Sequence, residues 1–194
     1  MKKTFLFFIF TCFIFSFSFA QNEDLKRQIS EKALSIESLE CDFVQTKHLK
    51  VLNNELVSRG KMYYLKGGKL RWEYLEPQST VFAINGKDDP NRIKAKAAAM
   101  ILDLVSGGCL NDGSGFESSV EEKDGFYSVE LLPKRREIKM LFEKITLSFD
   151  KKTLLVSKAE LTAKNSDVTS VEFHDIKTGV DIPSDMFILQ IYRR

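Results

Sequence analysis

The sequence predicts an α+β fold that is mainly antiparallel β, with one large sheet and two helices. Three observations carry this prediction. Most of the chain after residue 38 alternates apolar and polar residues with a period of two. The strand-like segments follow one another without the strand–helix alternation that builds parallel sheets. A sheet of eight or more strands has to curl or close, and the two helices are what remains to fill or cap its concave side.

The first segment, residues 1–20, is expected to be a signal peptide rather than part of the fold. Two lysines precede an apolar run, and Ser18 and Ala20 occupy the −3 and −1 positions of a cleavage site. An uncleaved membrane anchor is the alternative, but the run is short for a span of roughly 20 residues. Cys12 lacks the preceding small residue of a lipoprotein signal. We therefore expect a soluble mature protein with a single domain, 21–194.

The charge of the mature chain excludes a nucleic-acid function. The full chain has 29 Lys+Arg and 27 Asp+Glu. The signal peptide removes two lysines and no acid, so 27 bases face 27 acids and the net charge is zero. A basic field of the kind that draws a protein to nucleic acid is absent.

The N-terminal half of the domain predicts one helix followed by a meander of antiparallel strands. Leu25, Ile29, Ala33 and Ile36 recur at spacings of four, four and three, which is typical of an amphipathic helix. The period then changes to two. The expected strands, separated by Asn, Gly and Pro turns and ending in an Asn85-Gly86 hairpin signal, are 39–51, 55–66, 69–75 and 79–86.

The second half predicts one central helix and five more strands. The helix is expected over 88–108, with Pro90 at its start and one apolar stripe that includes Met100, Ile101 and Leu104. In the tail, Pro183 indicates an edge or a turn. The strands are expected over 116–122, 125–133, 140–150, 153–164 and 168–176.

No residue pattern asks for catalysis or for a metal. Ser114 lies in a loop without the strand–elbow–helix context of a hydrolase nucleophile. The histidines, His48 and His174, lie far apart and have no metal-ligand spacing. We expect no enzyme, no metal and no cofactor. Cys41 and Cys109, the mature cysteines, could form one disulfide or remain buried thiols, and the sequence leaves both alternatives open.

The apolar faces of the predicted strands are the candidate binding surface. Three neighbouring strands could present their apolar residues to one concave surface, and the only tryptophan, Trp72, is among them. Such alternation is also what an ordinary half-buried core shows, and composition cannot separate a filled barrel from a hollow one. The residues are Met62, Tyr64, Leu70, Trp72, Tyr74, Phe82 and Ile84, with the helix stripe of Met100, Ile101 and Leu104.

Residues 39–87 carry a specific resemblance to a known family. A Phe-x-Gln strand at 43–45 is followed by Gly60 before an aromatic strand, then by an Arg-Trp-x-Tyr strand at 71–74 and by Pro77. This order resembles the periplasmic lipoprotein carrier family, LolA, and the Lys-His pair after the glutamine is most similar to members from Bacteroidetes-type bacteria. The late segment ending in Phe187 is similar to the closing strand of that family.

The resemblance implies an incomplete, half-open barrel with a helical lid over a hydrophobic cavity. It implies a periplasmic monomer that takes acylated lipoproteins from an inner-membrane LolCDE-type ABC transporter to an outer-membrane acceptor, with no covalent chemistry. Phe43 and the apolar residues named above would line the acyl-chain cavity. Alternatives are an envelope lipid or lipoprotein sensor, a glycolipid carrier on the same barrel and, less in keeping with the residues, a lipid-active hydrolase.

Two departures from the family concern the lid. Many members carry a basic residue after the aromatic strand that bonds to the lid, and Lys66 is the nearest candidate here. The family also continues past its Asn-Gly turn with another aromatic strand, whereas this chain runs from Asn85-Gly86 almost directly into Pro90. These departures leave open the geometry of the lid and whether the cargo is a lipoprotein or a glycolipid.

Overall fold

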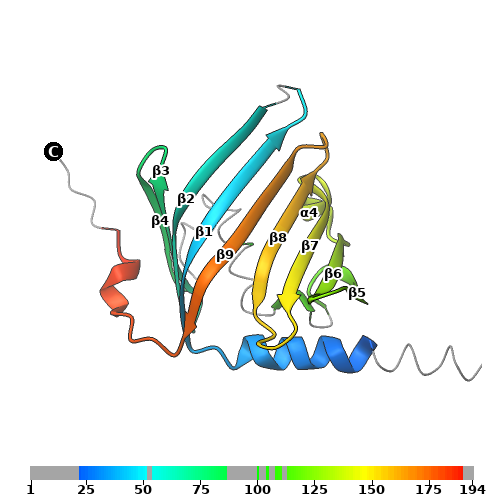
Figure 1. Ribbon diagram of the computed structural model, residues 1–194, viewed down its shortest axis with the longest axis horizontal. Coiled ribbons are helices and arrows are strands. Elements are labelled where there is room, and N and C mark those ends of the chain that lie inside the picture. The colour runs from blue at the N-terminus through cyan, green and yellow to red at the C-terminus, as the bar shows by residue number, and fades with distance from the viewer. Residues whose placement is uncertain are drawn as a thin grey trace, which may run out of the picture.

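Nine antiparallel strands form one open sheet. The computed structural model describes residues 22–51, 54–86, 100, 104, 108–110 and 113–189. The strand order is β4-β3-β2-β1-β9-β8-β7-β6-β5, so the first and last strands pair in the centre and, within the described residues, β4 and β5 stay apart (Figure 1). The strands are β1 Ser38–Leu49, β2 Asn54–Leu65, β3 Lys69–Glu76, β4 Thr80–Asn85, β5 Phe116–Glu122, β6 Phe126–Pro133, β7 Phe142–Asp150, β8 Val156–Ala163 and β9 Val168–Thr178.

The predicted strands are confirmed, and the period of two places their apolar residues on one side. In β1, Leu39, Cys41 and Phe43 are buried while Asp42 and Val44, which alternate with them, are only partly covered. The registers align such residues across the sheet, since opposite residues in paired strands point to the same face. One hydrophobic core therefore runs along the concave face from β4 to β5.

The N-terminal helix, residues 22–34, lies across one end of the strands (Figure 1). Its predicted stripe is confirmed, because Ile29 and Ala33 are buried, as is Ile36 just after the helix. Ala33 and Ile36 meet Leu39 and the turn before β8 around a void of only about 10 Å³. Such a void is too small for more than a single water, so this junction is closely packed.

The central helix is described at two positions. Met100 and Leu104 are both helical, with Leu104 buried and Met100 partly buried against the core. Ile101, most of the expected 88–108 helix and the shortened segment after Gly86 lie outside the described residues. The short 3-10 helix η1, Gly108–Leu110, holds Cys109. Cys41 and Cys109 are both buried thiols with no disulfide between them.

The ends of the sheet contain one element that the sequence did not predict and one expected turn that is not tested. Gly86 adopts a φ of 103° and its N–H donates to the Gly68 carbonyl, and among the described residues no strand pairs with the far edge of β4. The hairpin expected there therefore stays a prediction. A short helix that the sequence did not indicate, α4 Arg136–Lys139, joins β6 to β7.

In the tail Pro183 begins a turn, which is one of the two alternatives that the sequence indicated. It precedes the 3-10 helix η2, Ser184–Phe187, which packs on the outer face of β3 and β4 (Figure 1). Phe187 is buried there, and the Arg71 guanidinium donates to the Met186 carbonyl at 2.7 Å. No helix in the described part of the chain is long and apolar enough to cross a membrane.

Candidate functional site

An aromatic cluster occupies the concave face of β1 to β4. The Phe43 and Trp72 rings lie 4.0 Å apart between centroids, and the Tyr74 ring meets Phe43 edge-on at 5.4 Å. Phe43 can lie over β2 only because its register partner is Gly60. A Cβ at that position would lie 2.6 Å from the Phe43 ring and 1.9 Å from the Glu73 carbonyl oxygen. The Phe-x-Gln, Gly and Arg-Trp-x-Tyr segments are thus parts of one packing unit.

Polar atoms are buried within this cluster. The Tyr74 hydroxyl donates to Gln45 Oε1 at 3.0 Å, which satisfies a largely buried glutamine. The Trp72 indole N–H is buried and makes no hydrogen bond of ordinary geometry to the described residues. Burial raises the pKa of Tyr74, although the nearby Trp72 N–H and Gln45 act in the opposite direction. The glutamine of the Phe-x-Gln motif therefore holds the tyrosine, a role that the sequence alone did not reveal.

The sheet brings the predicted strand residues to one face. Register joins Met62, Trp72 and Phe82 across three strands, and likewise Tyr64, Leu70 and Ile84. That they line a cavity stays a prediction. The candidate residues differ in burial. Phe82 is 41% exposed, Tyr74 and Met100 are partly buried, and Ile101 lies outside the described residues. The buried members are Phe43, Met62, Tyr64, Leu70, Trp72, Ile84 and Leu104.

Lys66 contacts the segment that leads from the N-terminal helix into β1. Its Nζ forms an ion pair with the Glu37 carboxylate, and its backbone N–H donates to the Glu37 carbonyl at 2.7 Å. The expected contact between Lys66 and a helical lid is not tested, because most of the central helix lies outside the described part of the chain. It stays a prediction.

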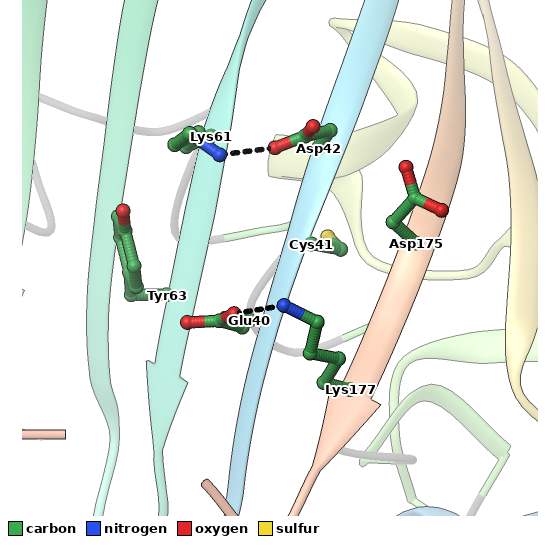
Figure 2. A pocket seen from close by; sticks show the side chains of 7 residues that line it. All are labelled: Glu40, Cys41, Asp42, Lys61, Tyr63, Asp175 and Lys177. Carbon is green, nitrogen blue, oxygen red and sulfur yellow. Dashed lines mark hydrogen bonds and ion pairs between the residues drawn. The ribbon is translucent and has the colours of Figure 1, made fainter. Parts of the chain in front are cut away.

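The convex face is charged and carries a shallow depression of about 230 Å³ (Figure 2). Lys61 pairs with Asp42 at 2.7 Å and Lys177 pairs with Glu40 at 2.9 Å, each pair bridging neighbouring strands. A β-bulge forms the depression, because the register of β1 against β9 shifts between Glu40 and Asp42. Asp175, at a φ of 50°, is the extra residue that β9 carries opposite β1 at this bulge. Charged groups line this surface, so it is unsuited to an acyl chain.

The described residues do not assemble reactive groups. Burial raises the pKa of the Cys41 thiol to about 12, which keeps it protonated and a poor nucleophile. The Ser114 hydroxyl accepts a bond from the Phe116 N–H at 3.4 Å within a turn. No cluster of potential metal ligands occurs among the described residues. The geometry supports apolar contact on the concave side and ion pairing on the convex side.

These features define an open antiparallel half-barrel whose inner face is apolar and whose outer face is charged. Residues 34–190 match the sequence model of the family described as "Outer membrane lipoprotein carrier protein LolA". The match covers most of the chain, so the chain belongs to the LolA family.

Individual proteins that resemble this chain share only a low sequence identity with it. Proteins named "Outer-membrane lipoprotein carrier protein" from two Francisella tularensis strains, WY96-3418 and LVS, are 26% identical over 200 residues, covering 96% of this chain and 92% of the relative. A LolA superfamily protein from Nitrosomonas europaea is 15% identical with a TM-score of 0.45, covering 84% of this chain and 97% of that one. The Mycobacterium tuberculosis lipoprotein LppX is 12% identical with a TM-score of 0.41, covering 82% and 97%.

Proposed function

We propose that this protein carries lipoproteins through the periplasm by holding their acyl chains against the concave face of β1 to β4. The observation that carries the proposal is the aromatic surface built on Phe43, Trp72 and Tyr74. It is apolar and continuous with the core, yet it ends in Phe82, whose side chain is 41% exposed on the same face. Membership of the LolA family and the names of the Francisella relatives support the choice of cargo.

The energetics favour an imperfect fit between carrier and acyl chain. Each buried methylene contributes about 0.8 kcal/mol, so burial of only part of one chain already supplies many kcal/mol. A carrier that enclosed every chain fully could not release its cargo. Methionine side chains adapt to irregular apolar ligands, and Met62 and Met100 both border the core of this half.

The proposal includes a route between two membranes. After removal of residues 1–20 the protein would move in the periplasm as a monomer. It would receive acylated lipoproteins from an inner-membrane LolCDE-type ABC transporter and deliver them to an outer-membrane acceptor. No covalent step is needed, because transfer between the three sites requires only that acyl chains leave one apolar surface for another. The names of the relatives support the direction of this route.

A matched pair of variants on opposite faces of the sheet tests the proposal. Phe82 lies on the concave face and Leu75 on the convex face, and both are exposed. We expect the mature protein to bind a triacylated lipopeptide but not the deacylated peptide in titration calorimetry. Phe82→Ser should weaken this binding about tenfold, a loss of roughly 1.4 kcal/mol, because it removes apolar contact.

Leu75→Ser is the control and should leave the affinity within about twofold. Equal binding of the acylated and deacylated peptides would contradict the proposal, since the peptide rather than the lipid would then be recognised. Equal loss in the two variants would place the lipid elsewhere than on the concave face.

A further inference from the structure

One end of the sheet gathers cations that have no acidic ion-pair partner among the described residues. The registers place the β1–β2 end, the β8–β9 turn and α4 at the same end, opposite the N-terminal helix (Figure 1). The backbone joins them, because the Lys164 N–H donates to the Leu141 carbonyl at 3.4 Å and the Lys50 N–H to Asp167 at 3.0 Å. We call this surface the cationic rim, made of Lys47, Lys50, Lys134, Arg136, Lys139 and Lys164.

The cationic rim differs from the rest of the described surface. All six side chains are exposed, and none forms an ion pair with a described residue. On the sheet faces, by contrast, lysines form cross-strand pairs such as Lys61 with Asp42 and Lys144 with Glu130. Arg135, beside the rim, donates to the Gly113 carbonyl at 3.3 Å.

The charge at this end is positive even though the mature chain is neutral. Among the described residues at this end, seven cations, the rim and Arg135, face five carboxylates. Those carboxylates are Glu55, Glu117, Glu137, Glu143 and Asp167. Asp167 already accepts bonds from Lys50 and Asn165, and Glu55 lies 3.9 Å from His48. The resulting excess of two positive charges among the described residues of this end orients it toward a negatively charged surface.

Exposed apolar side chains stand directly beside these cations. Val51 follows Lys50 and is 91% exposed, while Met140 and Leu141 follow Lys139, with Met140 64% exposed. Leu56 is exposed on the β2 side of the same end. Cations next to apolar side chains are the combination that binds bilayer surfaces: the cations meet anionic headgroups and the apolar groups enter the acyl boundary.

We propose that the cationic rim docks this protein onto the surface of a bilayer that contains anionic phospholipids. A membrane fits better than an acidic protein because the cations are spread over three loops and, among the described residues, have no ion-pair partner that fixes their positions. A diffuse headgroup field needs no fixed geometry, whereas a protein carboxylate does. The proposal goes beyond lipoprotein carriage, because it concerns contact with the bilayer itself and requires no cargo.

Vesicle flotation of the mature protein without any lipoprotein tests this docking. We expect binding to vesicles of phosphatidylethanolamine with phosphatidylglycerol, weakening as salt is raised, and little binding to pure phosphatidylcholine. The combined substitution Lys134→Gln, Arg136→Gln and Lys139→Gln should weaken binding roughly a hundredfold, since each cation near such a surface contributes about fivefold. Met140→Ser should weaken it about fivefold with no change of charge.

A charge-matched control separates the rim from net charge. Lys144→Gln, Lys151→Gln and Lys158→Gln also remove three charges, but from lysines that already form ion pairs with glutamates. This control should change binding less than about threefold. If the α4 variant does not fold by circular dichroism, Lys47→Gln, Lys50→Gln and Lys164→Gln provide the same test from the other two loops.

Three results would overturn the proposal. Equal loss in the rim variant and the control would show that only net charge matters. Equal binding to phosphatidylcholine would show that headgroup charge is not recognised. A folded protein that binds neither vesicle would assign the cationic rim to an acidic protein partner instead of a membrane.

Discussion

The two halves of the sheet have the same architecture but different inner faces. In β6 to β8 most concave residues are aliphatic, and Val129, Leu131, Ile145 and Leu147 are completely buried, while the register pair Tyr127 and Phe149 is the aromatic exception on this face. In β1 to β4 the same face is aromatic and ends in the exposed Phe82. The comparison shows that one continuous sheet can have two kinds of inner face, and under the proposed function the aliphatic half is packed as a core while the aromatic half receives the acyl chains.

The difference follows from side-chain shape. Branched aliphatic residues interdigitate at high density and leave little room for a guest. Aromatic rings pack as plates, as the 4.0 Å contact of Phe43 with Trp72 shows, and they need small neighbours such as Gly60. We therefore expect changes in the aliphatic half to affect stability alone, and changes in the aromatic half to affect stability and lipid binding together.

The largest effect is expected from Gly60→Ala in the aromatic half. The new methyl group would collide with the Glu73 carbonyl and the Phe43 ring, so β2 would have to move away from β3. We expect a loss of about 4 kcal/mol in the free energy of unfolding, measured by urea denaturation.

Gly125→Ala is the control for this change. Gly125 has a φ of 82°, but no atom lies within 4 Å of the position that a Cβ would take. We therefore expect only backbone strain, which lowers the free energy of unfolding by about 1 kcal/mol. A Gly60→Ala protein as stable as the Gly125→Ala protein would show that the aromatic half is loosely packed around Phe43.

The next effect compares one buried residue from each half. Met62→Ala and Leu147→Ala both empty a fully buried position, and each should cost about 3 kcal/mol in the free energy of unfolding. Only Met62→Ala should also change the affinity for a triacylated lipopeptide, measured under conditions where both variants are folded. If Leu147→Ala changed that affinity as much, the division between the halves would be wrong.

The smallest effect concerns the pH dependence of stability near Cys41. Burial raises the pKa of this thiol from 9.0 to about 12. Its contribution is therefore complete below about pH 9 and is lost as the pH rises toward 12, because the unfolded chain ionises first. At about pH 10.5 the loss should reach roughly 2 kcal/mol relative to pH 8.

Cys41→Ala should remove this loss and keep any that tyrosines cause. Burial also raises the pKa values of Tyr63, Tyr64 and Tyr74, so only the difference between wild type and variant reports on the thiol. Identical pH profiles for the two proteins would indicate that water reaches Cys41.

Local periodicity predicted most of the sheet. The alternation of Leu39, Cys41 and Phe43 reflects the burial of one strand face, which is a local property and survives in the sequence as a period of two. The stripe through Ile29 and Ala33 predicted the N-terminal helix for the same reason. The shared face of the candidate residues followed once the strands and their turns were assigned.

Other features depend on contacts that periodicity does not record. The α4 helix spans only Arg136–Lys139 and buries no residue, so it leaves no apolar stripe. The bulge at Asp175 depends on the register in which β9 pairs with β1. The position of Phe187 depends on contacts of η2 with the outer face of β3 and β4. These are pairings between distant segments, and composition along either segment alone does not predict them.

The most direct test of the central claim is contact quenching of Trp72, the only tryptophan of the chain. A triacylated lipopeptide with brominated acyl chains would be titrated into the mature protein and compared with its unbrominated form. The reporter control carries Trp72→Phe with Leu75→Trp, which moves the indole to the convex face of the same strand. We predict that the brominated chains quench Trp72 in wild type and leave the control unchanged. Saturable binding that quenches neither protein, or that quenches the control alone, would contradict a lipid site on the aromatic half.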